Sequence, residues 1–428
     1  MEIEKDAAGG CSEGGIKMFW LKLGWRNLWR NRRRSFIELV SIGGSVFIAV
    51  FFNNLTYGTY ARMIDDGVRI GSGHIGIYNN RYLETRKVEQ TIPVEPVRGQ
   101  MLEESMVTTV HARLYVPGLI RSSRNSRAAV FLGIDFPVEL SDNPILRKKY
   151  FISGGVPKEE NGDSAVIGAA IANELGLNLG NKFVLTTQDA NGEIMNKLYR
   201  VSGIIRTGIR EIDSGMVMVP RENLARAIGR EGSAHEIAVM LKNQNLIPKA
   251  LPHIRDIARI QPGAKAYEWK EAMPGLAGTI RIDHAGLQIM VIFLYLIVGI
   301  GTVNTLLMSV IERSREFGLI RALGMGKGRI TVMVFTEALV LSVTGAALGS
   351  ALAVILGLYT STKGINLASL MTVRGIAGTI IDPILYSGWD WKNLIILNFG
   401  MVLLTLTASL YPAWQVLKIH PSEAMRKY

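Results

Sequence analysis

The chain has little of what covalent or metal chemistry needs. Its 428 residues include a single cysteine, Cys11, so no disulfide can form within the chain. The six histidines are scattered and show no metal-ligand spacing, so we expect no metal site. No Ser/His/Asp set or pair of carboxylates stands out either, and we expect no catalytic residues. Cys11 lies in a polar stretch with no apolar run before it, which argues against a lipoprotein or signal-peptide cleavage site.

A nucleotide-binding loop is also missing. The run from Gly71 to Gly76 fits G-x-G-x-x-G, but it precedes an expected strand where the motif should open a helix. The glycines around Lys327 do not make a P-loop, because Arg321 stands where its first glycine should be and no Ser or Thr follows the lysine. We therefore expect the chain to bind no cofactor, to hydrolyse no ATP and not to be an enzyme.

The net charge of +12 lacks the pattern of a nucleic-acid binder. The one long basic run is 30–34, and no basic face is interleaved with aromatics, so we expect no nucleic-acid partner. Hydrophobic residues make up 48% of the chain and the mean hydropathy is +0.21. These values indicate a few membrane spans together with one large soluble domain, and the basic residues then fit the cytoplasmic flanks of the spans.

Four apolar runs, each long enough to cross a bilayer, are expected to be transmembrane helices at 36–57, 285–310, 331–358 and 393–414. Arg32, Arg33 and Arg34 place the start of the first span in the cytoplasm. The segment 311–330 carries five Lys or Arg against two Glu, whereas the loop 359–392 carries three against two. Both termini, including the tail 415–428, are therefore expected inside a bacterial inner membrane.

An amphipathic helix is expected at 18–34, after a disordered cytoplasmic tail at 1–17. Trp25 and Trp29 belong to its apolar stripe, and basic residues occupy its other face. Such a helix lies in the inner leaflet, with its tryptophans at the depth of the lipid headgroups, and membrane lipid is thus an expected partner.

The long segment 58–284 is expected to be a mixed α/β domain outside the cytoplasm. Strands are expected at 74–78, 107–115, 128–134, 183–187, 198–205 and 216–219. The pair Asn191-Gly192 predicts a hairpin turn. Helices are expected at 169–175, 221–228 and 246–257, and helical stalks at 59–69 and 269–284.

The charged segment carries a specific pattern: Glu312-Arg-Ser-Arg-Glu-Phe-Gly318, then Arg321-Ala-Leu-Gly324, then a Glu-Ala pair at Glu337 before a glycine-rich span. It resembles the junction in the MacB/FtsX/Lol superfamily of ABC-transporter permeases. The opening at 25–31, the phrase 201–214 and the ending at 411–426 are similar to that superfamily too, and 201–214 resembles its lipoprotein-releasing (LolC/LolE-type) branch. The loop 359–392 is longer than expected in that branch.

The resemblance implies a fold with an N-terminal elbow helix, four spans and a two-lobed MacB-like periplasmic domain, its outer lobe at roughly 110–230 inserted in a lobe built from both flanks. It implies a coupling helix that docks on a cytoplasmic ABC ATPase dimer, where ATP and Mg²⁺ bind. The residues expected to transmit that contact are Glu312, Arg315, Glu316, Phe317, Leu319, Arg321, Leu323 and Gly324, with Phe317, Ile320 and Leu323 on one stripe.

Further partners implied are a second permease copy or paralogue and a periplasmic carrier or adaptor protein. The function implied is extraction of lipid-anchored protein from the inner membrane. Tripartite efflux or peptide export of the MacB type, and FtsX-like control of a cell-wall hydrolase, remain as alternatives.

Four residues inside the expected spans need an explanation. Glu337 lies about two turns into the third span, where an ionisable group is either functional or paired with Arg321 or Arg329. Glu38 is one turn from the arginines at 32–34 and is expected to snorkel or pair there. Gly345 and Gly349 form a small-xxx-small face that allows close helix packing.

Overall fold

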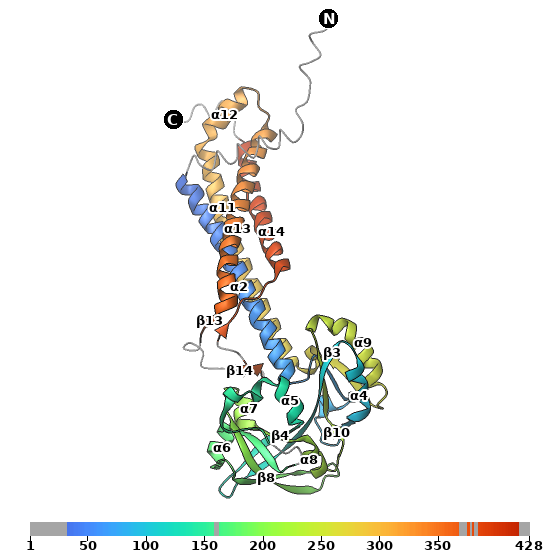
Figure 1. The fold of residues 1–428 in the computed structure, drawn as a ribbon. Helices are drawn as coiled ribbons and strands as arrows, with labels where there is room; N and C mark the ends of the chain where they lie inside the picture. The colour runs from blue at the N-terminus through green and yellow to red at the C-terminus, as the bar shows by residue number, and fades with distance from the viewer. Residues whose placement is uncertain (1–31, 158–161, 368–374, 377–378, 381–383, 419–428) are drawn as a thin grey trace. The chain divides into compact units, whose positions relative to one another are not determined.

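The computed structural model describes residues 32–157, 162–367, 375–376, 379–380 and 384–418. The chain divides into two compact units (Figure 1). The helical unit comprises 1–59, 283–365 and 385–428, and the α/β unit comprises 60–282 and 366–384. The tail 1–17, the tryptophans Trp25 and Trp29, and most of the expected amphipathic helix lie outside the described residues.

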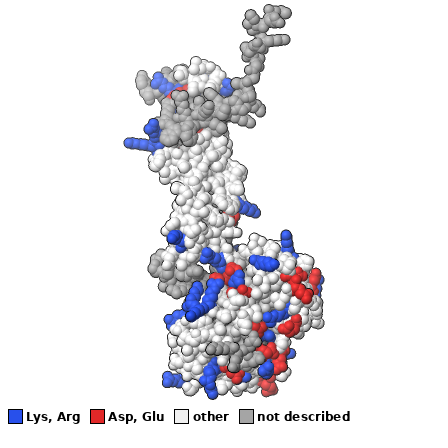
Figure 2. Space-filling view, in the orientation of Figure 1, with Lys and Arg blue, Asp and Glu red and all other residues white. Residues whose placement is uncertain are grey.

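Four apolar helices are long enough to cross a membrane, as the sequence predicts. They are α2 (Arg32–Ile70), α11 (Pro274–Glu312), α13 (Lys327–Lys363) and the stretch Trp391–Leu417. The middle stretch of the helical unit in Figure 2 shows almost no charged side chains, whereas charged side chains gather on the α/β unit. The core of the helical unit is built by apolar residues from α2, α11, α13 and α14, among them Ile42, Val46, Val298, Leu341 and Met401.

Two expected helices are interrupted, each beside a proline. The stalk expected at 269–284 is divided into α10 (Trp269–Ala272) and α11, with Met273 between them. The fourth span is divided at Ser409 into α14 (Trp391–Ala408) and α15 (Leu410–Leu417). Pro274 and Pro412 explain the breaks, because proline cannot donate a backbone hydrogen bond and crowds the turn before it.

The α/β unit contains a ten-stranded mixed sheet. Along one path its order is β12-β1-β11-β3-β4-β9-β6-β8-β5, and β7 pairs with β3 and β8. The strands are β1 (Ile75–Asn79), β3 (Val107–Arg121), β4 (Ser126–Ile134), β5 (Phe151–Gly154), β6 (Ser164–Gly168), β7 (Lys182–Gln188), β8 (Ile194–Ile205), β9 (Met216–Pro220), β11 (Glu236–Leu241) and β12 (Ala264–Glu268). The pairs β4–β9 and β6–β8 are parallel.

Short elements complete the unit. Its helices are α3 (Tyr82–Thr85), α4 (Glu95–Glu103), α5 (Phe136–Asp142), α6 (Ala169–Leu175), α7 (Arg210–Gly215), α8 (Arg221–Ala227) and α9 (Ile247–Ala258). Two-stranded pairs form between β2 (Ile92–Pro93) and β10 (Ser233–Ala234), β13 (Ile365–Asn366) and β16 (Ile384–Leu385), and β14 (Gly375–Ile376) and β15 (Thr379–Ile380). Gly192, in the expected turn between β7 and β8, has a positive φ of 88°, which glycine adopts without strain.

The long strand β3 joins two apolar cores. Its first half pairs with β11 and its second half with β4 and β7. One core contains β3 residues from Leu114 onward, with Phe131 and Tyr199, and the other contains Val110, Ile77 and Ile237. The two expected lobes therefore share one sheet.

A buried ionic network lies where β3 meets the end of α2. The guanidinium of Arg113 is fully buried and pairs with Glu139 through Nε at 2.6 Å and Nη2 at 3.0 Å. It also donates to the carbonyl oxygens of Arg69 and Ile70, the last residues of α2, and of Gly71, which follows the helix. A cation at the carboxyl end of a helix satisfies free carbonyls and complements the helix dipole. Arg113 thereby fixes the end of α2 to the sheet.

Candidate functional site

The expected coupling segment 311–330 is three elements and not one helix. Glu312 ends α11, a nine-residue helix α12 spans Ser314–Ala322, and α13 begins at Lys327. Arg313 forms the joint before α12, and Gly324, with φ of 96°, forms the turn after it. A positive φ suits glycine, so this turn explains why the helix stops where it does. Leu323 and Gly324 lie in the turn, and Arg315, Glu316, Phe317, Leu319 and Arg321 lie on α12.

Of the expected stripe, Phe317 and Ile320 lie on α12, and Leu323 follows directly after its last residue. Phe317 is 1% exposed and packs with Val310, Ile330, Met333, Val334, Ala413 and Val416. Leu319 is 55% exposed, and Leu323, beyond the last turn of α12, is 81% exposed. Phe317 therefore anchors α12 to its own unit, while Leu319 and Leu323 present apolar surface outward.

Arg313 is a site residue that the sequence did not single out. Its Nη1 is 3.2 Å from Oε2 of Glu337 on α13, and its Nε is 3.5 Å from Oε2 of Glu316 on α12. Its guanidinium also lies over the ring of Phe317. The expected pairing of Glu337 with Arg321 or Arg329 is thus wrong. The i,i+3 spacing of Arg313 and Glu316 could have predicted their pairing on a helix. Glu337 lies 24 residues further along the chain, so its pairing with Arg313 could not be deduced from the sequence.

Arg34 points into the helical unit. Its Nη1 pairs with Oε2 of Glu312 at 2.9 Å, and its Nη2 donates to the carbonyl oxygen of Thr305 at 2.7 Å. Arg32 and Arg33 are exposed. Arg34 instead joins the start of α2 to the end of α11, immediately before the Arg313 joint.

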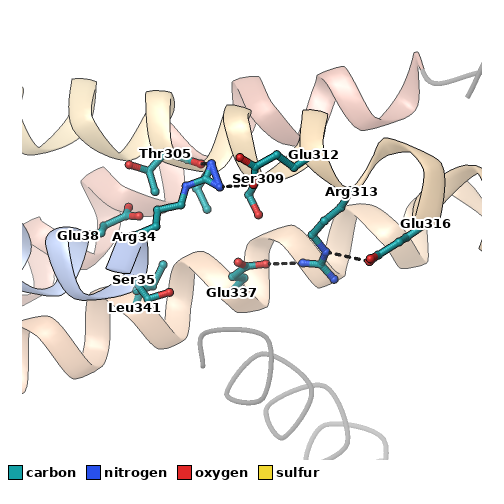
Figure 3. A pocket seen from close by; sticks show the side chains of 11 residues that line it. Arg34, Ser35, Glu38, Thr305, Ser309, Glu312, Arg313, Glu316, Glu337 and Leu341 are labelled. Carbon is teal, nitrogen blue, oxygen red and sulfur yellow. Dashed lines mark hydrogen bonds and ion pairs between the residues drawn. The ribbon is translucent and has the colours of Figure 1, made fainter. Parts of the chain in front are cut away.

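These three ion pairs border a polar cavity of about 130 Å³ (Figure 3). The cavity is lined by Arg34, Ser35, Glu38, Thr305, Leu306, Ser309, Glu312, Arg313, Glu316, Glu337 and Leu341. Four carboxylates thus face two guanidiniums. Glu38 neither snorkels nor pairs as expected: it is 4% exposed, and neither of its carboxylate oxygens has a hydrogen-bond partner among the described residues. We call this feature the junction cavity.

Gly345 and Gly349 lie on the face of α13 that contacts α2, away from the junction cavity. A Cβ on Gly349 would be 2.2 Å from the carbonyl oxygen of Gly43, and one on Gly345 would be 2.8 Å from Cγ2 of Ile42. The two helices approach each other more closely here than any side chain allows. The packing is within one chain.

The part of the chain that contains α12 and most residues of the junction cavity is similar to a known protein family. Residues 288–421, which run from α11 through the junction to α15, match the family described as FtsX-like permease C-terminal. The chain contains an FtsX-like permease domain. The resemblance to the MacB/FtsX/Lol superfamily is thereby confirmed, and α12 with its joint at Arg313 lies inside this FtsX-like permease domain.

Similar proteins differ in what they are named for. The lipoprotein-releasing system transmembrane protein LolC of Xylella fastidiosa (strain 9a5c) is 24% identical over 61% of this chain and 64% of LolC. The macrolide export ATP-binding/permease protein MacB of Bdellovibrio bacteriovorus is 34% identical over 30% of this chain and 17% of MacB. The chain therefore spans less than two thirds of these relatives' length.

Among solved structures, the periplasmic region of MacB from Actinobacillus actinomycetemcomitans matches 48% of this chain and 94% of its own. Its TM-score is 0.35 and its identity is 15%.

Proposed function

We propose that this chain is the permease subunit of an ABC transporter, with a cytoplasmic ATPase dimer as its separate motor and with both chain termini on the cytoplasmic side of a bacterial inner membrane. ATP and Mg²⁺ bind on the motor. The observation that carries this proposal is the position of α12, a short helix between two apolar helices and inside the FtsX-like permease domain.

The helix α12 has an exposed face that a partner protein could contact and a buried face through which its movement could reach the neighbouring helices. Leu319 and Leu323 offer apolar surface, and an exposed apolar patch rimmed by charge is typical of a protein contact. On the other face, Phe317 fills an apolar pocket, and the side chain of Arg313 bonds to α12 and α13. Displacement of α12 would therefore be transmitted to α13, and through the chain at Arg313 to α11.

The cargo that we propose is a lipid-anchored protein, extracted by a pair of permeases and passed to a periplasmic carrier or adaptor. It is supported by the LolC relatives, which are named for lipoprotein release, and by the phrase at 201–214. Export of a small molecule is the second candidate, and it is supported by the higher identity to a macrolide exporter across 132 residues.

The first experiment is purification of the tagged chain from its native membranes, followed by an assay of vanadate-sensitive ATP hydrolysis. We expect an ATPase to co-purify with wild type and to be lost, with at least a tenfold drop in activity, in Leu319→Asp. The reason is that a buried charge at the centre of a contact has no partner. Leu102→Asp, at a 52% exposed position on α4, is the matched control and should retain the ATPase.

The outcome that contradicts the proposal is a well-folded wild-type chain that brings no ATPase from the membrane. If the ATPase is present, the purified complex in nanodiscs separates the two cargoes. Stimulation of hydrolysis by a triacylated lipoprotein and not by a macrolide supports extraction, and the reverse supports export.

A further inference from the structure

Of the four carboxylates that line the junction cavity, Glu38 is the one that forms no ion pair with the described residues. It lies on α2 one turn after Arg34 and is 4% exposed, and its two oxygens lack donors within the described part of the chain. The hydroxyl of Thr302, on α11, is also buried and lies beside Glu38, but no hydrogen bond of normal length forms between the two groups. An ionised carboxylate enclosed in this way loses most of its hydration without a protein hydrogen bond of normal length in return, which is unfavourable.

The cations that border the cavity are already engaged by other carboxylates. Arg34 is bound to Glu312 and to the carbonyl oxygen of Thr305. Arg313 is bound to Glu337 and Glu316. Arg34 and Glu38 have the i,i+4 spacing at which opposite charges pair on a helix, yet Arg34 reaches across to α11. Glu38 thus competes with Glu312 for one guanidinium and, in this arrangement, does not obtain it.

The surroundings of Glu38 favour a positive charge on or beside it. The polar and charged groups that line the cavity with it are Arg34 and Ser35 from α2, Thr305, Ser309 and Glu312 from α11, Arg313 at the joint, Glu316 from α12 and Glu337 from α13. With Glu38 ionised, these sum to two excess negative charges. In the residues that the structure describes, no three His, Cys, Asp or Glu side chains are grouped as a metal ion requires. A proton bound to Glu38 reduces this excess negative charge and, unlike a metal ion, requires no set of coordinating side chains.

We propose that Glu38 is a proton-binding site within the helical unit, and that its proton is exchanged for the guanidinium of Arg34. While Arg34 holds Glu312, Glu38 is a neutral carboxylic acid. When Arg34 leaves Glu312, the O–H bond of Glu38 breaks, its electron pair stays on the carboxylate, and the proton passes to water. The cavity has room for several water molecules. Arg34 then pairs with Glu38 one turn away on the same helix, and no other reactant is needed.

The consequence is that proton occupancy decides what Arg34 ties together. With the proton bound, Arg34 links α2 to the residue of α11 that directly precedes the α12 joint. With the proton released, Arg34 satisfies its own helix and the link to α11 is broken. The site is thus a switch between two pairings of one arginine, independent of the motor proposed above.

The test is infrared spectroscopy of the full chain in nanodiscs, with ¹³C-labelled glutamate to separate glutamic from aspartic acid. We expect the C=O band of a protonated glutamic acid at neutral pH, with its small shift in ²H₂O. The band should be lost in Glu38→Gln and retained in Glu337→Gln, the matched control on the same cavity. In Glu38→Asp the band should move out of the ¹³C-glutamate position, so a carboxylic acid at 38 is followed even if the glutamine variant folds poorly.

Two results would overturn the proposal. One is the absence of a glutamic acid band from wild type at neutral pH, and the other is a band that disappears with Glu337 instead of Glu38. If the band is absent and Na⁺ or K⁺, but not acid, protects the chain against unfolding, Glu38 is an ionised alkali-metal site. No ATPase enters this assay, so its failure is distinct from failure of the proposed transport function.

Discussion

At the scale of single residues, the α/β unit is notable for histidines that are buried in their neutral form. His235 is fully buried and stacks on Tyr82 with ring centroids 4.6 Å apart. Its Nδ1 accepts the backbone N–H of Tyr115 at 3.0 Å, and its Nε2 donates to the carbonyl oxygen of Val88 at 3.0 Å. Both ring nitrogens are engaged in hydrogen bonds. A second proton would have to bind to Nδ1, where it would face the N–H of Tyr115 and find no acceptor. Burial lowers the pKa of His235 to about 4.

This arrangement predicts a loss of stability in mild acid. The folded-state pKa lies below the unfolded value of about 6.5, so the unfolded chain takes up a proton that the folded chain refuses. The stabilisation from neutral His235 is complete above pH 6.5, the pKa in the unfolded chain, and is lost as the pH falls toward 4, the pKa in the folded chain. Between pH 7 and pH 5 we expect about 2 kcal/mol of the unfolding free energy to be lost through His235 alone.

The measurement is thermal unfolding of the solubilised full chain at both pH values. Burial also lowers the pKa values of His74 and His111, so wild type loses stability through all three. His235→Gln should remove about 2 kcal/mol of the acid loss, because its amide can donate to Val88 and accept from Tyr115 without titrating. His253→Gln, at an exposed position on α9, should leave the acid loss unchanged. Equal losses in both variants would contradict the assignment to His235.

At the scale of elements, the contact between α2 and α13 depends on glycines, whose lack of a side chain lets the two backbones approach each other closely. Gly43 faces Gly345 and Gly349, and neighbouring residues such as Ile42 and Ala346 are buried around them. Backbones that approach this closely gain dispersion contacts along their length, which is how helices associate where burial from water is no longer available. The glycines of α13 are therefore packing residues.

We expect Gly349→Ala to separate α2 from α13 and lower stability by at least about 1–3 kcal/mol, since the new methyl group would meet backbone and not a movable side chain. Gly44→Ala is the matched control, because a Cβ at Gly44 would have no atom within 4 Å. Thermal unfolding in nanodiscs compares the two variants. A Gly349→Ala chain as stable as Gly44→Ala would show that the helices are not in this close contact.

The elements also show which features a sequence can predict. The four apolar helices follow from local hydropathy, and the strand β7 from local alternation. The strand β11 is buried on both faces, so it has no alternation to detect and was not predicted. The partners of Glu337, Glu38 and Arg113 depend on which distant elements become neighbours, and no local pattern contains that information. The double burial of β11 and the pairing of Arg313 could only come from the fold.

At the scale of the whole molecule, α11 is a continuous helix of 39 residues that belongs to both units. At 1.5 Å per residue it is about 58 Å long. Its last residue precedes the Arg313 joint, and residues of its first turns pack in the core of the α/β unit, Leu276 among them. If α12 is the contact for a motor, α11 is the element by which its displacement reaches the α/β unit.

This role predicts that a break in α11 uncouples the two units without disabling either. Ala285 is exposed, so Ala285→Pro changes no buried contact, but it removes one helical hydrogen bond and crowds the carbonyl of Arg281, at a cost of about 3 kcal/mol in helix stability. We expect the complex to keep its ATPase activity within twofold, while nucleotide-dependent hydrogen exchange in the α/β unit disappears. Gly286→Ala, where a Cβ meets no atom within 4 Å, should strengthen the helix and preserve the response. If exchange in Ala285→Pro still responds to nucleotide as in wild type, the signal does not travel through α11, and α2, which Arg113 fixes to the sheet, is the next element to test.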